Sequence, residues 1–429
     1  MLSTSGNQIG RQRDAGLDGL RGLAAVAVLL FHVWLFTESH TTTRREGLLD
    51  YVLVEFKLGL YLFFVLSGFL LVRPFLRAAM NGEQTPRFVA YTRNRVARIA
   101  PAYWLSLVGA AALLLTAGGS ALRHMPAGAD VWQYVFFGQN FSEDTIMRLN
   151  PATWSLPIEL AFYLLVPGIG LLAVVAARRL RESIGVSVAT GVVALLMIIA
   201  GLYWNKATVG ESSVYRLALP GMLPYFALGM LAALGAGLWE RRGKATGVVL
   251  HLPTAVFVCG LLVLAAAIYN YERNIYSETL QVIRDVPAAT GFALIVAGVA
   301  MATDRSRFGR ALSWRPLVAL GTVSYGVYLW HVPLLLAGRT AGWLPDGMLA
   351  ASALVLTISL ALGALSWRFV ESPSIAWARK DRAPERDELA AHRERRPMHR
   401  PATQPALAGT TTSSSSANLP VARSVSASG

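Results

Sequence analysis

The chain has 429 residues, of which 54% are hydrophobic and only 15% are charged, against about a quarter in ordinary globular domains. This composition excludes a string of soluble domains and indicates that most of the chain lies in lipid. The single cysteine, Cys259, excludes an internal disulfide and a cysteine-based zinc cluster.

Ten apolar runs long enough to cross about 30 Å of hydrocarbon follow one another along the chain. They are approximately residues 20–36, 58–72, 99–116, 154–177, 185–203, 217–238, 248–269, 286–302, 317–336 and 347–369. The first run does not read as a cleavable signal peptide, because nine further runs follow it and no small-residue cleavage site is present. The sequence therefore predicts an all-α polytopic membrane protein with about ten transmembrane helices.

The basic residues predict which connections face the cytoplasm. The amino terminus and the even-numbered connections carry 18 Lys and Arg, whereas the longer odd-numbered connections carry ten. Basic residues concentrate on the cytoplasmic side, so both termini are predicted to be cytoplasmic, in a protein of the plasma membrane. The net charge of +14 then reports orientation, and we expect no nucleic-acid partner.

Three regions are expected along the chain: a cytoplasmic leader at 1–16, a membrane domain at 17–375 and a tail at 376–429. The tail is rich in charged residues and then in Ser, Thr, Ala and Pro, a composition that cannot bury enough apolar surface to fold. The tail is therefore predicted to be disordered. The apolar stretch 131–141 is too short to span and is expected at the outer interface or folded back into the bundle.

Ionisable residues inside a bilayer are costly and are functional candidates by default. Glu159, His32 and His331 are the ones that lie well within predicted spans, at similar depths in the outer half. Arg21 precedes His32 by eleven residues, which places both within about 20° on one helix face, with Asp18 roughly 40° away. Imidazole titrates near neutrality, so His32 is predicted to be a general base. The alternative for His331 is a buried structural histidine or an interface anchor.

A cluster of arginines ends the second connection in the segment RNRVARIAP. Arg95 and Arg98 are three residues apart on one expected helix face, which suits a polyanion such as a nucleotide diphosphate, with Arg93 nearby. The alternative is that the cluster only sets topology.

Two other patterns argue against familiar mechanisms. No G-x-S-x-G segment surrounds Ser67, which makes it a poor nucleophile candidate, and Ser67 and Gly68 suit close helix packing. Residues 237–244 depart from a phosphate-binding P-loop in spacing and are followed by Ala245, so ATP-driven transport is not supported.

Several segments together resemble the acyltransferase-3 family of integral membrane O-acyltransferases. They are LDGLRGLAAVAVLLFHV, FFVLSGFLL, RNRVARIAP, TWSLPIELAFY, SYGVYLWHVP and RFVESP, spread over about 350 residues. The resemblance implies ten core spans, an acyl-CoA donor on the cytoplasmic side and a hydroxyl acceptor that is commonly a sugar, with no metal. The resemblance also implies that Arg21 and His32 are catalytic residues. It further implies that Arg95 and Arg98 contact the donor and that Glu159 supports the site. Further supporting candidates are Asp18, Ser67, Trp154, Ser155, Tyr163, Tyr325 and His331.

The acceptor stays open at this stage. Some members of the family modify surface polysaccharides, whereas others acylate sugars of macrolides and related secondary metabolites. No hydrolase-like domain is fused to the ten runs, and this favours a small glycosylated acceptor. The rival class is a transporter that uses buried His and Glu as a proton relay, and a binding or scaffold protein is a third reading. The acyl chain, the side on which the acceptor binds and the oligomeric state are not predicted.

Overall fold

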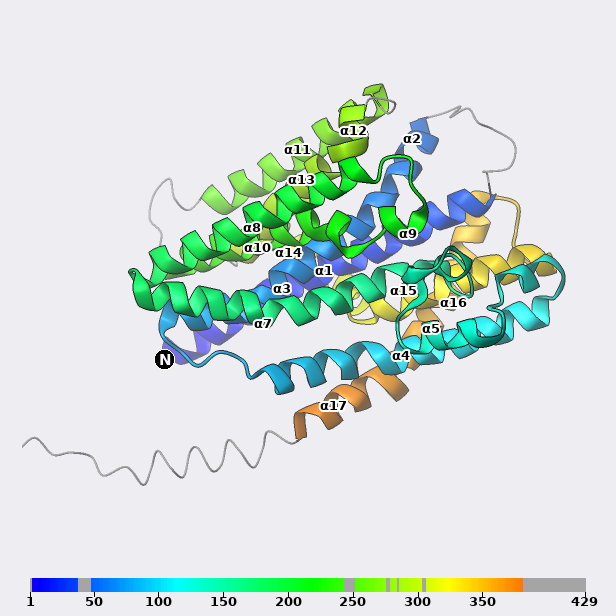
Figure 1. The fold of residues 1–429 in the computed structure, drawn as a ribbon, viewed down its shortest axis with the longest axis horizontal. Helices are drawn as coiled ribbons and strands as arrows, with labels where there is room; N and C mark the ends of the chain where they lie inside the picture. Colours follow the sequence, from blue (N-terminus) through cyan, green and yellow to red (C-terminus); the bar gives the residue numbers. More distant parts are fainter. Residues whose placement is uncertain are drawn as a thin grey trace, which may run out of the picture. The chain divides into compact units, whose positions relative to one another are not determined.

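The computed structural model describes residues 2–37, 48–242, 251–274, 278–283, 285–302 and 306–380, which are helical and contain no strand. The helices run roughly parallel to one long axis, and the connection from α3 to α4 lies at the end where α1 begins (Figure 1). The long helices are α1 (Leu2–Thr37), α3 (Gly59–Asn81), α4 (Phe88–Ala117), α7 (Ser155–Arg179), α8 (Glu182–Ala207), α10 (Leu219–Arg241), α11 (Leu252–Asn274), α13 (Val286–Met301), α15 (Arg315–Ala341) and α16 (Met348–Ser366).

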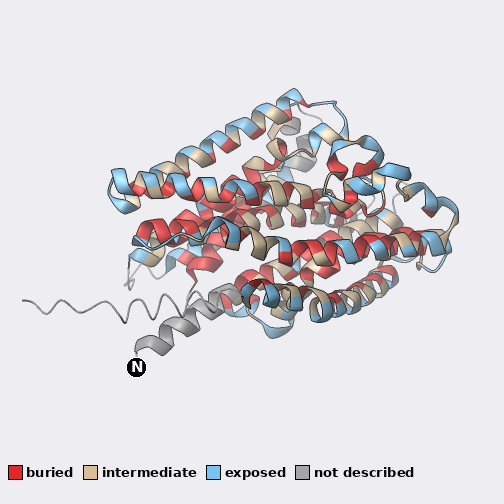
Figure 2. Ribbon diagram, turned by 60° about the horizontal axis from the view of Figure 1, so that its bottom comes forward, coloured by how far each residue is buried: buried red, intermediate tan, exposed pale blue. Residues whose placement is uncertain are grey.

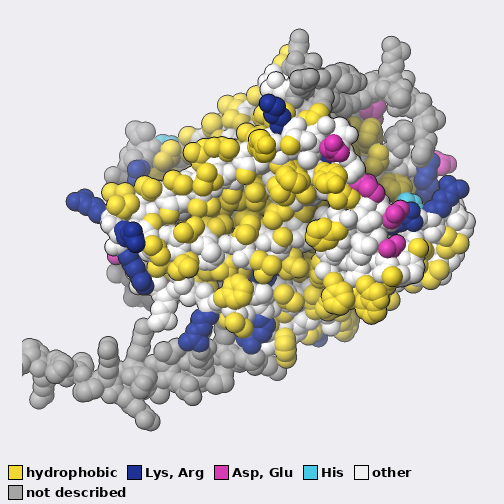
Figure 3. Space-filling model, in the orientation of Figure 1, with side chains coloured by type: hydrophobic (Ala, Val, Ile, Leu, Met, Phe, Trp, Pro, Cys, Tyr) yellow, Lys and Arg dark blue, Asp and Glu magenta, His cyan; other side chains and the backbone are white. Residues whose placement is uncertain are grey.

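The prediction of an all-α membrane protein is confirmed. Within the described ranges, nine helical segments are long and apolar enough to cross a membrane. The predicted eighth run corresponds to α13, which is helical but has only 16 residues, or about 24 Å of rise. Hydrophobic side chains cover the middle of the face in Figure 3, as a lipid-facing surface requires.

The boundaries predicted for the leader and for the tail do not coincide with the ends of α1 and α17. The expected leader is continuous with the first span, because α1 begins at Leu2. Helix α17 (Ser372–Lys380) extends five residues past the expected start of the tail at residue 376. The rest of the predicted tail, residues 381–429, lies outside the described residues, as do residues 248–250 of the seventh run.

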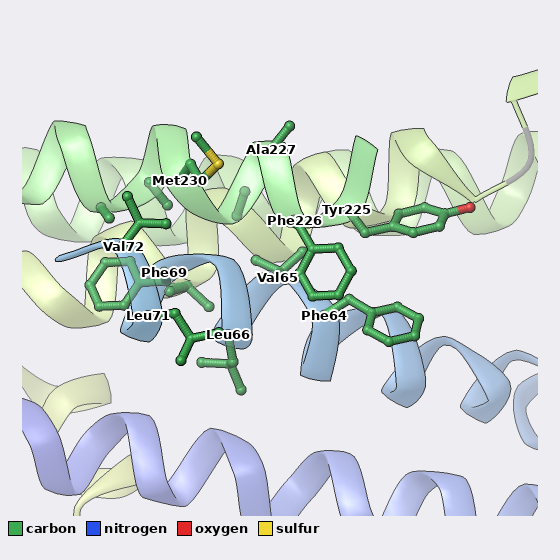
Figure 4. Packing of buried hydrophobic residues seen from close by; sticks show 14 of the residues in the cluster. Phe64, Val65, Leu66, Phe69, Leu71, Val72, Tyr225, Phe226, Ala227 and Met230 are labelled. Carbon is green, nitrogen blue, oxygen red and sulfur yellow. The ribbon is translucent and has the colours of Figure 1, made fainter. Parts of the chain in front are cut away.

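Helix α3 lies in the middle of the bundle, and its buried residues form a core with α10. Figure 4 shows the aromatic and aliphatic side chains of the two helices interleaved around Phe64, Val65 and Phe226. Gly68 allows this close approach, because a Cβ there would collide with the backbone carbonyl of Phe226. The packing role predicted for Gly68 is confirmed. Buried residues concentrate on the inward faces of the helices (Figure 2).

Helices α1 and α15 also pack in close contact along their length. Gly321 of α15 lies against the backbone of Asp18, and a Cβ at this glycine would collide with the Asp18 carbonyl oxygen. On α1, Gly22 lies similarly close to the carbonyl oxygen of Leu317, where a Cβ would come within 2.8 Å. These glycines set the register that brings the polar residues of the two helices together.

The apolar stretch 131–141 folds into a short helix, α5 (Val131–Val135), and a single helical turn at Gln139–Phe141. Its Tyr134 is buried and donates to the Thr145 carbonyl over 2.5 Å, and burial raises the pKa of Tyr134. Trp132 and Phe136 on the same stretch are exposed. One face thus packs on the protein while the aromatic face suits the membrane interface, which agrees with the first of the two expected positions.

We predict that Gly321→Ala destabilises the protein by about 2 kcal/mol or more, because its methyl group must displace the backbone of α1. The check is the unfolding temperature of the detergent-purified protein. Gly235→Ala is the matched control, since Gly235 is also in a membrane helix and no atom lies within 4 Å of the added Cβ. Equal unfolding temperatures for the two variants would contradict the proposed register contact.

Candidate active site

Side chains from α1, α3, α4, α7 and α15 line a cavity in the bundle. Its charged members are Arg21, Arg95, Arg98 and Glu159. Its hydroxyl groups come from Ser67, Ser155, Tyr163, Ser324, Tyr325 and Tyr328. The structure therefore brings together residues that are up to about three hundred positions apart in the sequence.

Glu159 is the hydrogen-bonding centre of this cavity. Its Oε1 accepts a 2.7 Å hydrogen bond from the Ser67 hydroxyl of α3 and a 2.5 Å hydrogen bond from the Tyr163 hydroxyl one turn along α7. Both donors are uncharged hydroxyl groups, and the arginines that line the same cavity supply the positive charge near Glu159. Ser67, which the sequence favours as a packing residue, holds Glu159 in place.

Three arginines face the cavity from two helices. Arg95 and Arg98 lie one turn apart on α4, and the Arg95 guanidinium lies 5.9 Å from the centroid of the Tyr163 ring. Arg21 enters from α1, 3.9 Å from the Asp18 carboxylate. Arg93 is not among the described lining residues, so only two of the three predicted arginines of α4 belong to the cavity.

A buried carboxylate that the sequence reasoning did not select lies beside these arginines. Glu371 is 2% exposed, accepts a 3.1 Å hydrogen bond from the Ser366 hydroxyl, and lies within electrostatic range of Arg98 and Arg21. It ends a π-helical turn, Trp367–Glu371, which is a common feature of functional sites. The reading of Glu159 as the one carboxylate well inside a span was thus incomplete. The RFVESP motif, which contains Glu371, is the signal in the sequence that points to this residue.

The two histidines predicted at similar depth are in contact. His331 Nε2 lies 3.2 Å from His32 Nδ1, and the ring centroids are 4.9 Å apart. His32 Nδ1 also lies 2.8 Å from the Val28 carbonyl oxygen, and His331 Nδ1 lies 3.2 Å from that of Val327. His331 is 1% exposed, whereas His32 is only partly buried.

An aromatic layer lies between the histidine pair and the cavity. Tyr328 and Phe63 line the cavity, their ring centroids are 6.0 Å apart, and the Tyr328 ring is 5.7 Å from that of His331. Neither histidine is among the described lining residues. The predicted face of α1 is thus divided: Arg21 faces the cavity, and His32 faces His331 beyond the layer.

The segment 150–155, which leads into the first residue of α7, fixes this layer. Asn150 donates to the Leu329 carbonyl over 2.8 Å, and the Tyr328 hydroxyl donates to the Ala152 carbonyl over 2.5 Å. Ser155 lies 2.8 Å from the same tyrosine hydroxyl. Three residues of one short segment, Asn150, Ala152 and Ser155, thereby hold this part of α15 in place next to His331.

Trp154 and Tyr325 support the cavity wall from two sides. Trp154 packs its ring edge to face on Phe64, with centroids 6.3 Å apart. Tyr325 donates to the Ile99 carbonyl of α4 over 3.0 Å, one residue after Arg98. Among the described residues, no group of three or more His, Cys, Asp or Glu is arranged to hold a metal ion.

The chain matches one protein family over most of its length and is similar to several bacterial proteins. The profile of the acyltransferase-3 family, described as an acyltransferase domain, matches residues 14–368. YrhL of Bacillus subtilis is 26% identical over 377 residues, which cover 83% of this chain and 54% of that protein. The peptidoglycan O-acetyltransferase OatA of Listeria monocytogenes is 23% identical over 384 residues, covering 85% of this chain and 56% of that protein.

A third relative, the O-acetyltransferase OatA of Staphylococcus aureus, is 23% identical over 381 residues, which cover 83% of this chain and 56% of that protein. The chain therefore spans about half the length of the curated relatives it matches. No solved structure matches it. The family match covers well over half of the chain and includes both the arginine-lined cavity and the histidine pair, so the protein belongs to the acyltransferase-3 family of membrane acyltransferases.

Proposed function

We propose that the protein transfers an acyl group from acyl-CoA to a hydroxyl group of a carbohydrate-containing acceptor. The observation that carries this proposal is the pairing of an arginine-lined cavity with a histidine pair on α1 and α15, two of the helices that line the cavity. The cavity suits an anionic donor, and a neutral imidazole suits the removal of a hydroxyl proton. Membership of the family supports the reaction class.

The donor head group is assigned to the arginine side of the cavity. Three guanidinium groups line the cavity, and such groups make charge-assisted, often bidentate contacts to phosphates like those of CoA. The basic residues of the even-numbered connections favour the cytoplasmic side for this end of the bundle, with both termini cytoplasmic in the plasma membrane.

The acyl group then has to reach the histidine pair. Arg21 and His32 are eleven residues apart on α1, a rise of about 16.5 Å, and the pantetheine arm is the extended part of the donor that spans such a distance. The arm would pass the layer formed by Phe63 and Tyr328.

The chemical step is a direct acyl transfer. His32 takes the proton of the acceptor hydroxyl while its oxygen attacks the thioester carbonyl carbon, and a tetrahedral intermediate forms. The carbon–sulfur bond then breaks, and His32 returns the proton to the CoA thiolate. The products are an ester of the acceptor and free CoA thiol.

The acceptor class is proposed from the relatives. All three carry the name O-acetyltransferase, and two of the names specify peptidoglycan. These names favour a cell-surface polysaccharide as the acceptor. The expectation from the ten runs alone had instead favoured a glycosylated secondary metabolite. An acetyl group is accordingly the first acyl chain to test. Acetyl-CoA offered to the protein in vesicles with each acceptor class would separate the two alternatives.

We predict that His32→Ala lowers the turnover number by at least about 100-fold, because the hydroxyl proton loses its acceptor. Acyl transfer would be followed by the release of CoA thiol from protein in lipid vesicles. His251→Ala is the control, since His251 is exposed and lies outside the site. Retention of more than about a tenth of wild-type turnover by a folded His32→Ala protein would remove this residue from the role of base.

We predict that Arg95→Ala and Arg98→Ala each raise the KM for acyl-CoA about 10- to 100-fold, because a charge-assisted contact to phosphate is lost. Lysine at either position should recover only part of the loss, since it keeps the charge but not the bidentate geometry. The KM for the acceptor should change little. Donor titrations measure all three effects.

Arg87→Ala is the matched control for the arginine variants. Arg87 belongs to the same basic segment and is exposed at the start of α4, but it is not among the described lining residues. If the arginines of this segment only set membrane topology, all three alanine variants will keep the wild-type donor dependence. That result would contradict the donor site.

A further inference from the structure

The contacts of the histidine pair determine where its protons lie. His32 Nδ1 has two neighbours within hydrogen-bonding distance, the Val28 carbonyl oxygen at 2.8 Å and His331 Nε2 at 3.2 Å. His331 Nδ1 has the Val327 carbonyl oxygen at 3.2 Å. Carbonyl oxygens accept hydrogen bonds and never donate them, so each Nδ1 must carry a hydrogen to make its backbone contact.

This requirement fixes the other two nitrogens in the neutral pair. With its hydrogen on Nδ1, a neutral His331 has a lone pair on Nε2, and that lone pair can accept the Nδ1–H of His32. The hydrogen of His32 is then shared between Val28 and His331. The remaining nitrogen, Nε2 of His32, is unprotonated and able to take a proton.

We propose that His331 is a positioning residue for His32: its Nε2 accepts the His32 Nδ1–H and thereby holds the tautomer whose Nε2 removes the hydroxyl proton. The proposal rests on the proposed function, in which His32 is the base. A structural histidine or an interface anchor would need only a side chain that fills the volume. The role proposed here also requires a hydrogen-bond acceptor at the position of His331 Nε2.

The same contact also acts during the reaction. When His32 holds the proton of the acceptor, its Nδ1–H becomes a donor on a charged ring, and charge-assisted hydrogen bonds are about twice as strong as neutral ones. The pair lies where α1 and α15 pack tightly, with His331 at 1% exposure and the Tyr328 ring beside it. Water therefore has little room to replace the His331 lone pair.

The test compares His331→Gln with His331→Leu in the purified protein in lipid vesicles. Glutamine places an amide oxygen near the position of the lost Nε2 and can accept the His32 hydrogen, whereas leucine fills the space without an acceptor. We expect kcat to fall at least about 30-fold for the leucine variant and at most about 5-fold for the glutamine variant, with both KM values within about 3-fold of wild type. Similar kcat values for two folded variants would overturn the proposal.

A measurement on the wild-type protein keeps the proposal testable if a variant does not fold. Nitrogen NMR of protein labelled at histidine distinguishes protonated from unprotonated ring nitrogens, and comparison with His32→Ala assigns the His32 signals. We expect His32 to be protonated at Nδ1 and unprotonated at Nε2. The opposite tautomer would contradict the proposal. If instead His32→Ala itself remains active, the proposed function fails and not this inference alone.

Discussion

The close contact between α1 and α15 is the constraint on which the rest of the site depends. Because Gly321 has no side chain, the backbone of α15 can approach that of α1 at Asp18, and the two helices stay in contact along their length. One consequence is that Arg21 faces the cavity lined by both helices. A second, further along the same contact, is that His32 and His331 come within hydrogen-bonding distance. A single packing register therefore sets both halves of the site.

The low dielectric of the membrane interior explains why each of the two carboxylates of the site has hydrogen-bond donors and arginines close to it. Glu159 is held by Ser67 and Tyr163, and Glu371 by Ser366, with arginines near both carboxylates. A charge without such partners would cost several kcal/mol in this environment. The three arginines that line the cavity are then a binding feature, because they can make charge-assisted contacts to the phosphates of a donor.

Hydropathy and helix periodicity predict most of the fold and part of the site. They identify the helices and the face that carries Arg21 and His32, because both properties depend only on local sequence. The division of that face by Phe63 and Tyr328 depends on how distant helices pack, so no local pattern reveals it. Glu371 was missed because it follows the last apolar run, and the π-helical turn that buries it leaves no trace in hydropathy.

The most direct test of the account is to follow an isotopically labelled acetyl group from acetyl-CoA in vesicles that contain the purified protein and a polysaccharide acceptor. The account predicts label in an ester of the acceptor, with one free CoA thiol formed for each ester. Movement of an unmodified substrate across the membrane in response to a proton gradient, with no loss of acetyl-CoA, would contradict it. That result would show that the buried histidines and carboxylates serve transport and not acyl transfer.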